Sequence, residues 1–269
     1  MVRIAGTGLA VIAGMLFGWL LRIGVERWHA GELPLDRQPA HFHFPIVEFA
    51  LGTIWGLLAW RLLGLLIPAQ SVLGFVVPYL NLGYTLGLML LTFALMGVAT
   101  VNADEKSFTD IVTLPGVAVG CVFSVYLSDH MNRYLVPNLD PIREFRDRIL
   151  SAIAAAALVI LIQWLCRLTR RLEVGGWGEA HLMAMLAAWL GLEGALLAFT
   201  VGALIGLSLF ATLWLIPRAW RRNHGWALGR VSVAALLCAG GIVSCLWGPQ
   251  IHLIALRWSV LSKLALKFP

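Results

Sequence analysis

The stretch that decides the fold follows a cluster of arginines and reads Gly175-Gly176-Trp177-Gly178-Glu179, then Ala180-His181-Leu182-Met183-Ala184-Met185-Leu186-Ala187-Ala188-Trp189-Leu190. A glycine-rich turn that ends in a carboxylate leads here directly into an apolar helix. Apolar helices cross bilayers because a helix satisfies its own backbone hydrogen bonds in the hydrocarbon core. The stretch therefore predicts that Glu179 lies at a membrane boundary.

The composition of the whole chain agrees with a location in lipid. Of its 269 residues, 60% are hydrophobic and 13% are charged, and the mean hydropathy is +0.84. These values are typical of membrane proteins and exclude an ordinary soluble domain. We therefore expect an all-α polytopic membrane bundle of about eight transmembrane helices, at residues 4–21, 44–67, 80–101, 111–127, 149–166, 180–190, 195–216 and 231–247. The sixth segment is too short to cross alone, so it crosses partly or joins the seventh as a broken pair across Gly191-Leu192-Glu193-Gly194.

The placement of positive charge predicts the orientation of the bundle. If the loop between the first two helices is cytoplasmic, the loops on that side hold eleven arginine and lysine residues, against four in the internal loops on the other side. Cytoplasmic loops carry the excess of positive charge, so we expect a multi-pass protein whose loop between the first two helices faces the cytoplasm. The net charge of +6 then reports topology, and no nucleic acid is expected as a partner.

The rest of the chain adds no further domain. We expect residues 1–269 to form a single membrane domain whose first apolar segment is retained as an anchor. Residues 249–269 form an amphipathic tail that lies on the membrane surface or against a partner helix. The four cysteines stand singly within predicted helices, and His41 and His43 fit a solvated loop, so neither a metal nor another cofactor is expected.

Two polar clusters share the predicted cytoplasmic boundary. The first lies between the third and fourth helices and reads Asn102-Ala103-Asp104-Glu105-Lys106-Ser107-Phe108-Thr109-Asp110, and the second is the turn that ends at Glu179. Ionisable groups are costly where a membrane protein buries them, so carboxylates that meet from two hairpins indicate a water-accessible cleft. The alternative is that both clusters lie in solvated loops.

Three motifs of this chain resemble the type IV prepilin peptidases. They are Phe44-Pro45-Ile46-Val47-Glu48 at the opening of a helix, Asp110-Ile111-Val112-Thr113-Leu114-Pro115, and Gly176-Trp177-Gly178-Glu179 with the helix that follows it. That family comprises bacterial GxGD intramembrane aspartyl proteases, which remove a short, positively charged leader from pilin-like precursors at the cytoplasmic face of the inner membrane. The resemblance covers roughly residues 12–248 and implies that pilin-like precursors or transmembrane helices, pilus or secretion machinery subunits and membrane lipids are the partners.

The resemblance also shows where this chain departs from the family. It implies two catalytic aspartates at positions 102 and 179, where this chain has Asn102 and Glu179. An aspartyl protease needs two adjacent carboxyls that share one proton. An amide cannot act as a base near neutral pH, and the extra methylene of a glutamate displaces its oxygens by about 1 Å, which can cost about a hundredfold in rate. Together the two changes predict little or no proteolysis.

Two further features bear on activity. Asp104 can substitute for Asn102 only if the helix has already ended there, because two residues along a helix rotate a side chain by about 200°. Many members carry a zinc-binding, cysteine-containing insert with methyltransferase activity, but residues 22–43 of this chain contain no cysteine. Methyl transfer is therefore not expected.

Three functions remain open from the sequence. The first is a degenerate peptidase that binds its partner without cutting it, the second is an active peptidase with an Asp104 and Glu179 pair, and the third is a transporter or channel. Glu48 matches a family position and fits a structural role at the start of its helix. The residues that we expect to contribute to binding are Gly176, Trp177, Gly178, Asp110 and Glu48.

Overall fold

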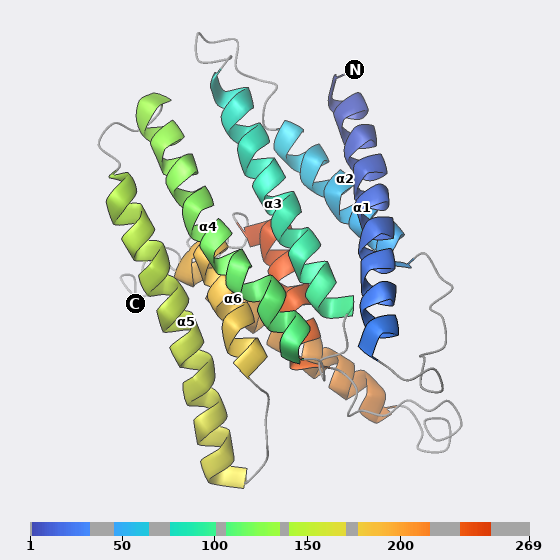
Figure 1. Cartoon of the computed structure of the whole chain (residues 1–269), viewed down its shortest axis with the longest axis vertical. Helices are drawn as coiled ribbons and strands as arrows, with labels where there is room; N and C mark the ends of the chain where they lie inside the picture. The colour runs from blue at the N-terminus through green and yellow to red at the C-terminus, as the bar shows by residue number, and fades with distance from the viewer. Residues whose placement is uncertain are drawn as a thin grey trace, which may run out of the picture.

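The computed structural model describes residues 2–32, 46–64, 76–100, 106–134, 140–170, 177–215 and 232–248 (Figure 1). These ranges contain the long helices α1 (Val2–Glu32), α2 (Ile46–Gly64), α3 (Val76–Thr100), α4 (Lys106–Tyr134), α5 (Pro141–Arg170) and α6 (Trp177–Leu215). A shorter helix, Val233–Gly248, follows them and is called helix 233–248 below. No strand occurs in these ranges, so the all-α prediction is confirmed. Of the predicted features, Asn102, Asp104, Gly176, the His41 and His43 loop and the tail 249–269 lie outside the described residues.

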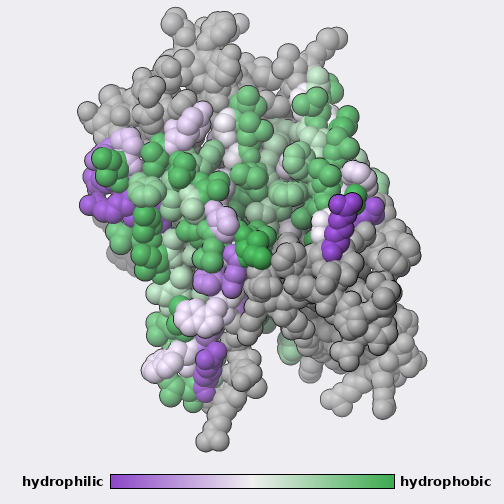
Figure 2. All heavy atoms as spheres, viewed as in Figure 1, coloured by the Kyte–Doolittle hydropathy of each residue, from purple (hydrophilic) through white to green (hydrophobic). Residues whose placement is uncertain are grey.

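The helices have the length and surface of membrane spans. Four of them hold a segment that is long and apolar enough to cross a bilayer, namely Ile4–Val25, Leu82–Thr100, Pro141–Leu168 and Trp177–Thr212, and Asp110–Tyr126 and Val233–Gly248 are shorter apolar helices. Large apolar side chains such as Leu9, Ile153 and Leu204 are exposed, and hydrophobic residues dominate the described part of the face in Figure 2. Such a surface is stable in lipid, which confirms the polytopic membrane bundle.

Two of the eight predicted helices are joined into one, α6, so the described residues contain seven helices. The sixth and seventh predicted segments form one helix that is interrupted at Gly191, where φ is 79° and ψ is 171°. Only glycine adopts this conformation without strain, so the predicted broken pair is confirmed. Arg148 of α5 stabilises the break, because its Nη1 donates to the carbonyl of Trp189 at 3.4 Å while its Nε donates to Glu144 at 2.8 Å.

Close packing at glycines joins α1 to α2. A Cβ atom on Gly14 would lie 2.8 Å from the Cα of Gly52, and one on Gly18 would lie 2.7 Å from the Cα of Glu48. The pairing runs in opposite directions along the two helices, so α1 and α2 are antiparallel. Lipid supplies no hydrophobic force between helices, and small residues compensate by letting the backbones approach closely.

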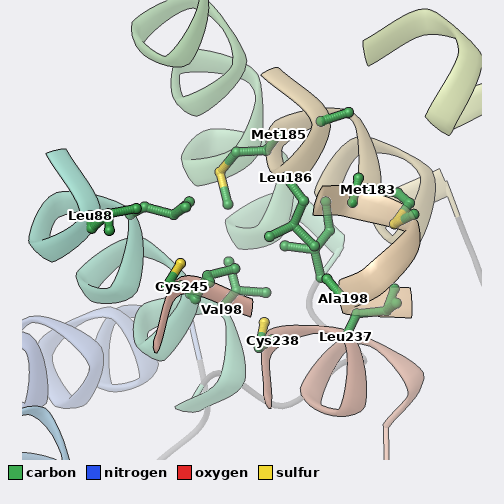
Figure 3. Close-up of a cluster of buried hydrophobic side chains, with 14 of the residues drawn as sticks. Leu88, Val98, Met183, Met185, Leu186, Ala198, Leu237, Cys238 and Cys245 are labelled. Atoms are coloured by element: carbon green, nitrogen blue, oxygen red, sulfur yellow. The ribbon is translucent and has the colours of Figure 1, made fainter. Parts of the chain in front are cut away.

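A second set of small residues joins α6 to helix 233–248. A Cβ atom on Gly240 would overlap the carbonyl oxygen of Ala198, and one on Gly202 would lie 2.6 Å from the carbonyl oxygen of Leu236. Figure 3 shows the core around this contact, to which α3 contributes Leu88 and helix 233–248 contributes Cys238. The bundle therefore depends on interhelical distances that only small residues permit.

This packing predicts opposite effects for two Gly→Ala substitutions. In Gly240→Ala the new methyl group would force α6 and helix 233–248 apart, and overpacking of this kind costs about 1–3 kcal/mol. Gly8→Ala on α1 is the matched control, because its methyl group would enter open space and gains up to about 1 kcal/mol of helix propensity. Thermal unfolding in detergent should show a lower Tm for Gly240→Ala only. An unchanged Tm for Gly240→Ala would show that the two helices are not in close contact.

Candidate functional site

Helices α4 and α6 lie side by side and run in the same direction. Three contacts recur at four-residue steps along α6: His181 meets Asp110, Met185 lies where a Cβ atom on Gly116 would be, and the Trp189 ring lies 2.6 Å from the Cβ position of Gly120. Residues four apart share one face of a helix, so this face of α6 packs along α4. Both helices therefore begin at the same end of the bundle (Figure 1).

The first of these contacts is polar and lies at that shared end. The Nδ1 atom of His181 is 2.7 Å from Oδ1 of Asp110, and the two side chains are 28% and 39% exposed. A carboxylate accepts only, so the geometry requires the proton on Nδ1. The half-exposed position leaves this end of the two helices accessible from outside the bundle.

Glu179 lies in the first turn of α6, two residues before His181. Its side chain is half-buried, whereas Trp177 beside it is 67% exposed. A carboxylate is favourable in the first turn because the backbone N–H groups there are unpaired and the helix dipole is positive. Asn102 lies outside the described residues, four positions before the first residue of α4, Lys106.

Trp189 fixes the register between α4 and α6. Its Nε1–H donates to the carbonyl of Gly116 at 2.9 Å, and its ring stacks on Phe123 with centroids 5.2 Å apart. Pro115, which lies inside α4, perturbs the backbone hydrogen bonding of that helix. The contribution of Trp189 was missed from the sequence, although the GxxxG spacing of Gly116 and Gly120 was a signal for a close helix contact.

Glu48 belongs to a neighbouring ion pair. Its Oε1 accepts from Nη1 of Arg22 at 3.1 Å, and the glutamate is buried between α1 and α2. Leu21 lies 3.4 Å from the Cβ position of Gly97, so this pair is beside the end of α3. Arg22 thus supplies the countercharge that a buried carboxylate needs, and the contribution of Glu48 to binding stays a prediction.

The described residues offer no metal site. No group of three histidine, cysteine, aspartate or glutamate side chains within them is arranged to hold an ion. The cysteines are free thiols, and Cys121, Cys238 and Cys245 are buried in the bundle. The chemistry of the described part of this end must come from the carboxylates, His181 and the backbone.

A double-mutant cycle tests the Asp110 and His181 contact. Asp110→Ala and His181→Ala should each lower the Tm and the free energy of unfolding in detergent. The loss of unfolding free energy in the double variant should be smaller than the sum of the two single losses by about 1 kcal/mol, because either single change removes the same bond. Arg146→Ala with Asp147→Ala is the matched control, since this pair at 3.5 Å is exposed and should show no coupling. Additive losses for Asp110 and His181 would contradict the contact.

The sequence is similar to those of several curated prepilin leader peptidase/N-methyltransferases. The relative from Pseudomonas aeruginosa is 24% identical over 215 residues, which cover 77% of this chain and 59% of that protein. The relative from Aeromonas salmonicida is 28% identical over 178 residues, which cover 65% of this chain and 52% of that protein. The relative from Neisseria gonorrhoeae is 26% identical over 164 residues, which cover 61% of this chain and 47% of that protein. This chain spans about three fifths of the length of the first relatives that it matches, between 59% and 65%.

No family model matches the chain, and no solved structure is similar to it. The apolar helices and these relatives describe a multi-pass bacterial membrane protein. The similarity extends over most of the chain. It supports membership of the type IV prepilin peptidase family, to whose prepilin leader peptidases this chain is related.

Proposed function

We propose that this chain binds pilin-like precursors, or related transmembrane helices of a pilus or secretion machine, without cutting them. The observation that carries the proposal is the contact between Asp110 and His181, which holds the beginnings of α4 and α6 side by side. Asn102 precedes one of these helices and Glu179 opens the other. In this proposal the two family positions meet at the same end of the bundle, where this chain carries an amide and a longer acid.

The chemistry of these two residues argues against peptide hydrolysis. Cleavage by an aspartyl protease requires one carboxylate that takes a proton from water and one carboxylic acid that polarises the scissile carbonyl. Asn102 has no proton to exchange near neutral pH, so position 102 does not supply the second carboxyl that this mechanism needs. The Asp110 carboxylate accepts a hydrogen bond from His181 and is engaged in holding the helices together.

The same end keeps the features that binding requires. Carboxylates at Asp110 and Glu179 attract a positively charged leader, and the exposed Trp177 offers an aromatic surface beside them. The excess of arginine and lysine in the loops on this side supports a cytoplasmic location for this end, where such a leader would be presented. In this proposal the apolar helix of the precursor stays in lipid beside the bundle.

A cleavage assay with candidate prepilins tests the loss of activity. The purified protein in detergent should leave the leader attached, while an active prepilin leader peptidase such as the Pseudomonas aeruginosa relative cuts under the same conditions. The precursor should still bind, and the mature pilin without its basic leader should bind at least tenfold more weakly, because the attraction to the carboxylates is lost. Robust turnover that Glu179→Ala abolishes would refute the proposal.

A reversion of both residues sharpens this test. Asn102→Asp combined with Glu179→Asp restores two carboxyls of ordinary length, so measurable cleavage should appear in the double variant, and each single variant should remain at least a hundredfold less active. The double reversion with Asp110→Ala is the control for the scaffold, because it removes the contact to His181. Equal activity of single and double variants would show that the two positions do not act together.

The alternative of an active enzyme with an Asp104 and Glu179 pair makes a different prediction in the same assay. Wild-type cleavage would then be lost on Asp104→Asn, which keeps the size of the side chain but removes the carboxyl, and Asn102→Ala would change the rate little. Cleavage that survives Asp104→Asn would reject this pair. Absence of cleavage by the wild-type protein would reject it as well.

A further inference from the structure

A second polar cluster lies where α2 ends, away from the candidate site. Arg61 is in the last turn of α2, and its Cζ lies 5.7 Å from the ring centroid of Trp247 in helix 233–248. Thirteen residues separate Arg61 from Glu48 along α2, which at 1.5 Å per residue is about 20 Å. Because Glu48 lies at the end of the bundle that carries the candidate site, Arg61 lies towards the opposite end.

Two polar atoms, one on α2 and one on helix 233–248, are buried without a hydrogen-bond partner. They are Nη1 of Arg61 and Oγ of Ser244, and Ser244 is 5% exposed. Ser244 and Trp247 are three residues apart and so share a face of helix 233–248. Buried donors without a partner are unfavourable, and a guanidinium carries a full charge in addition. Arg22, Arg143, Arg146 and Arg148 pair with Glu48, Asp147 and Glu144, and His181 pairs with Asp110, so none of these ion pairs includes Arg61.

We propose that Arg61, Ser244 and Trp247 form a binding site for the phosphate group of an anionic phospholipid. A guanidinium forms two parallel hydrogen bonds to a phosphate, and a serine hydroxyl donates a third. The phosphate would supply the acceptors that Arg61 and Ser244 lack. It would also neutralise a positive charge that sits between apolar helices.

The surroundings favour a lipid headgroup over free phosphate. Trp247 is 41% exposed and Trp60, next to Arg61, is 44% exposed, on helices whose outer faces are apolar. Tryptophan is enriched at the level of lipid headgroups, where its ring contacts acyl chains and its N–H reaches polar atoms. A lipid bound here would place its phosphate at Arg61 and its chains along α2 and helix 233–248.

Binding of defined lipids to the full chain tests the proposal independently of any peptidase activity. In an uncharged detergent, phosphatidylglycerol should raise the Tm of the wild-type protein in a saturable manner, while phosphatidylcholine and inorganic phosphate at equal concentration should have at most a tenth of that effect. Arg61→Gln should weaken the phosphatidylglycerol affinity at least tenfold and Ser244→Ala about threefold. Arg146→Gln, which removes an exposed arginine from α5, should leave it unchanged.

Each other outcome contradicts the site. An equal response of Arg61→Gln and the wild type would exclude Arg61 as the phosphate ligand. An equal effect of inorganic phosphate would exclude the lipid as the source of the phosphate, and no saturable response of the wild type would exclude the site altogether. If Arg61→Gln does not fold, Ser244→Ala and Trp247→Phe decide, because unchanged affinity in both would contradict the proposal.

Discussion

The close approach of α4 and α6 is the constraint on which the candidate site depends. Gly116 and Gly120 leave room on α4 for Met185 and Trp189 of α6, and the Trp189 N–H bonds to the α4 backbone. The two helices are parallel, so this packing also brings Asp110 and His181 together at their beginnings. The first turn of α6, with Glu179, and the beginning of α4 therefore lie at the same end of the molecule.

Packing in lipid explains why glycine recurs at the other helix contacts. The α1 and α2 pair meets at Gly14, Gly18 and Gly52, and α6 meets helix 233–248 at Gly202 and Gly240. Backbone approach replaces the hydrophobic force that would join helices in water. The break at Gly191, held by Arg148, then lets one helix serve two contacts, with α4 before the break and with helix 233–248 after it.

Much of this architecture follows from the sequence because bilayer thickness limits the possible helices. The apolar segments and the break at Gly191 were predicted, since each follows from segment length or from glycine. The partnership of Asp110 with His181 and the hydrogen bond from Trp189 were not predicted. The residues that make these two contacts are 71 and 73 positions apart in the chain. The contacts therefore depend on the relative register of α4 and α6, which local periodicity does not determine.

The account is tested most directly by the proximity of residues 102 and 179. In a chain whose four native cysteines are replaced, Asn102→Cys with Glu179→Cys should form a cross-link with a short bismaleimide in native membranes. Its yield should match that of Asp110→Cys with His181→Cys, and Asn102→Cys with Ser244→Cys should give none. Failure of the 102 and 179 pair to link, in a protein whose 110 and 181 pair links efficiently, would contradict the account.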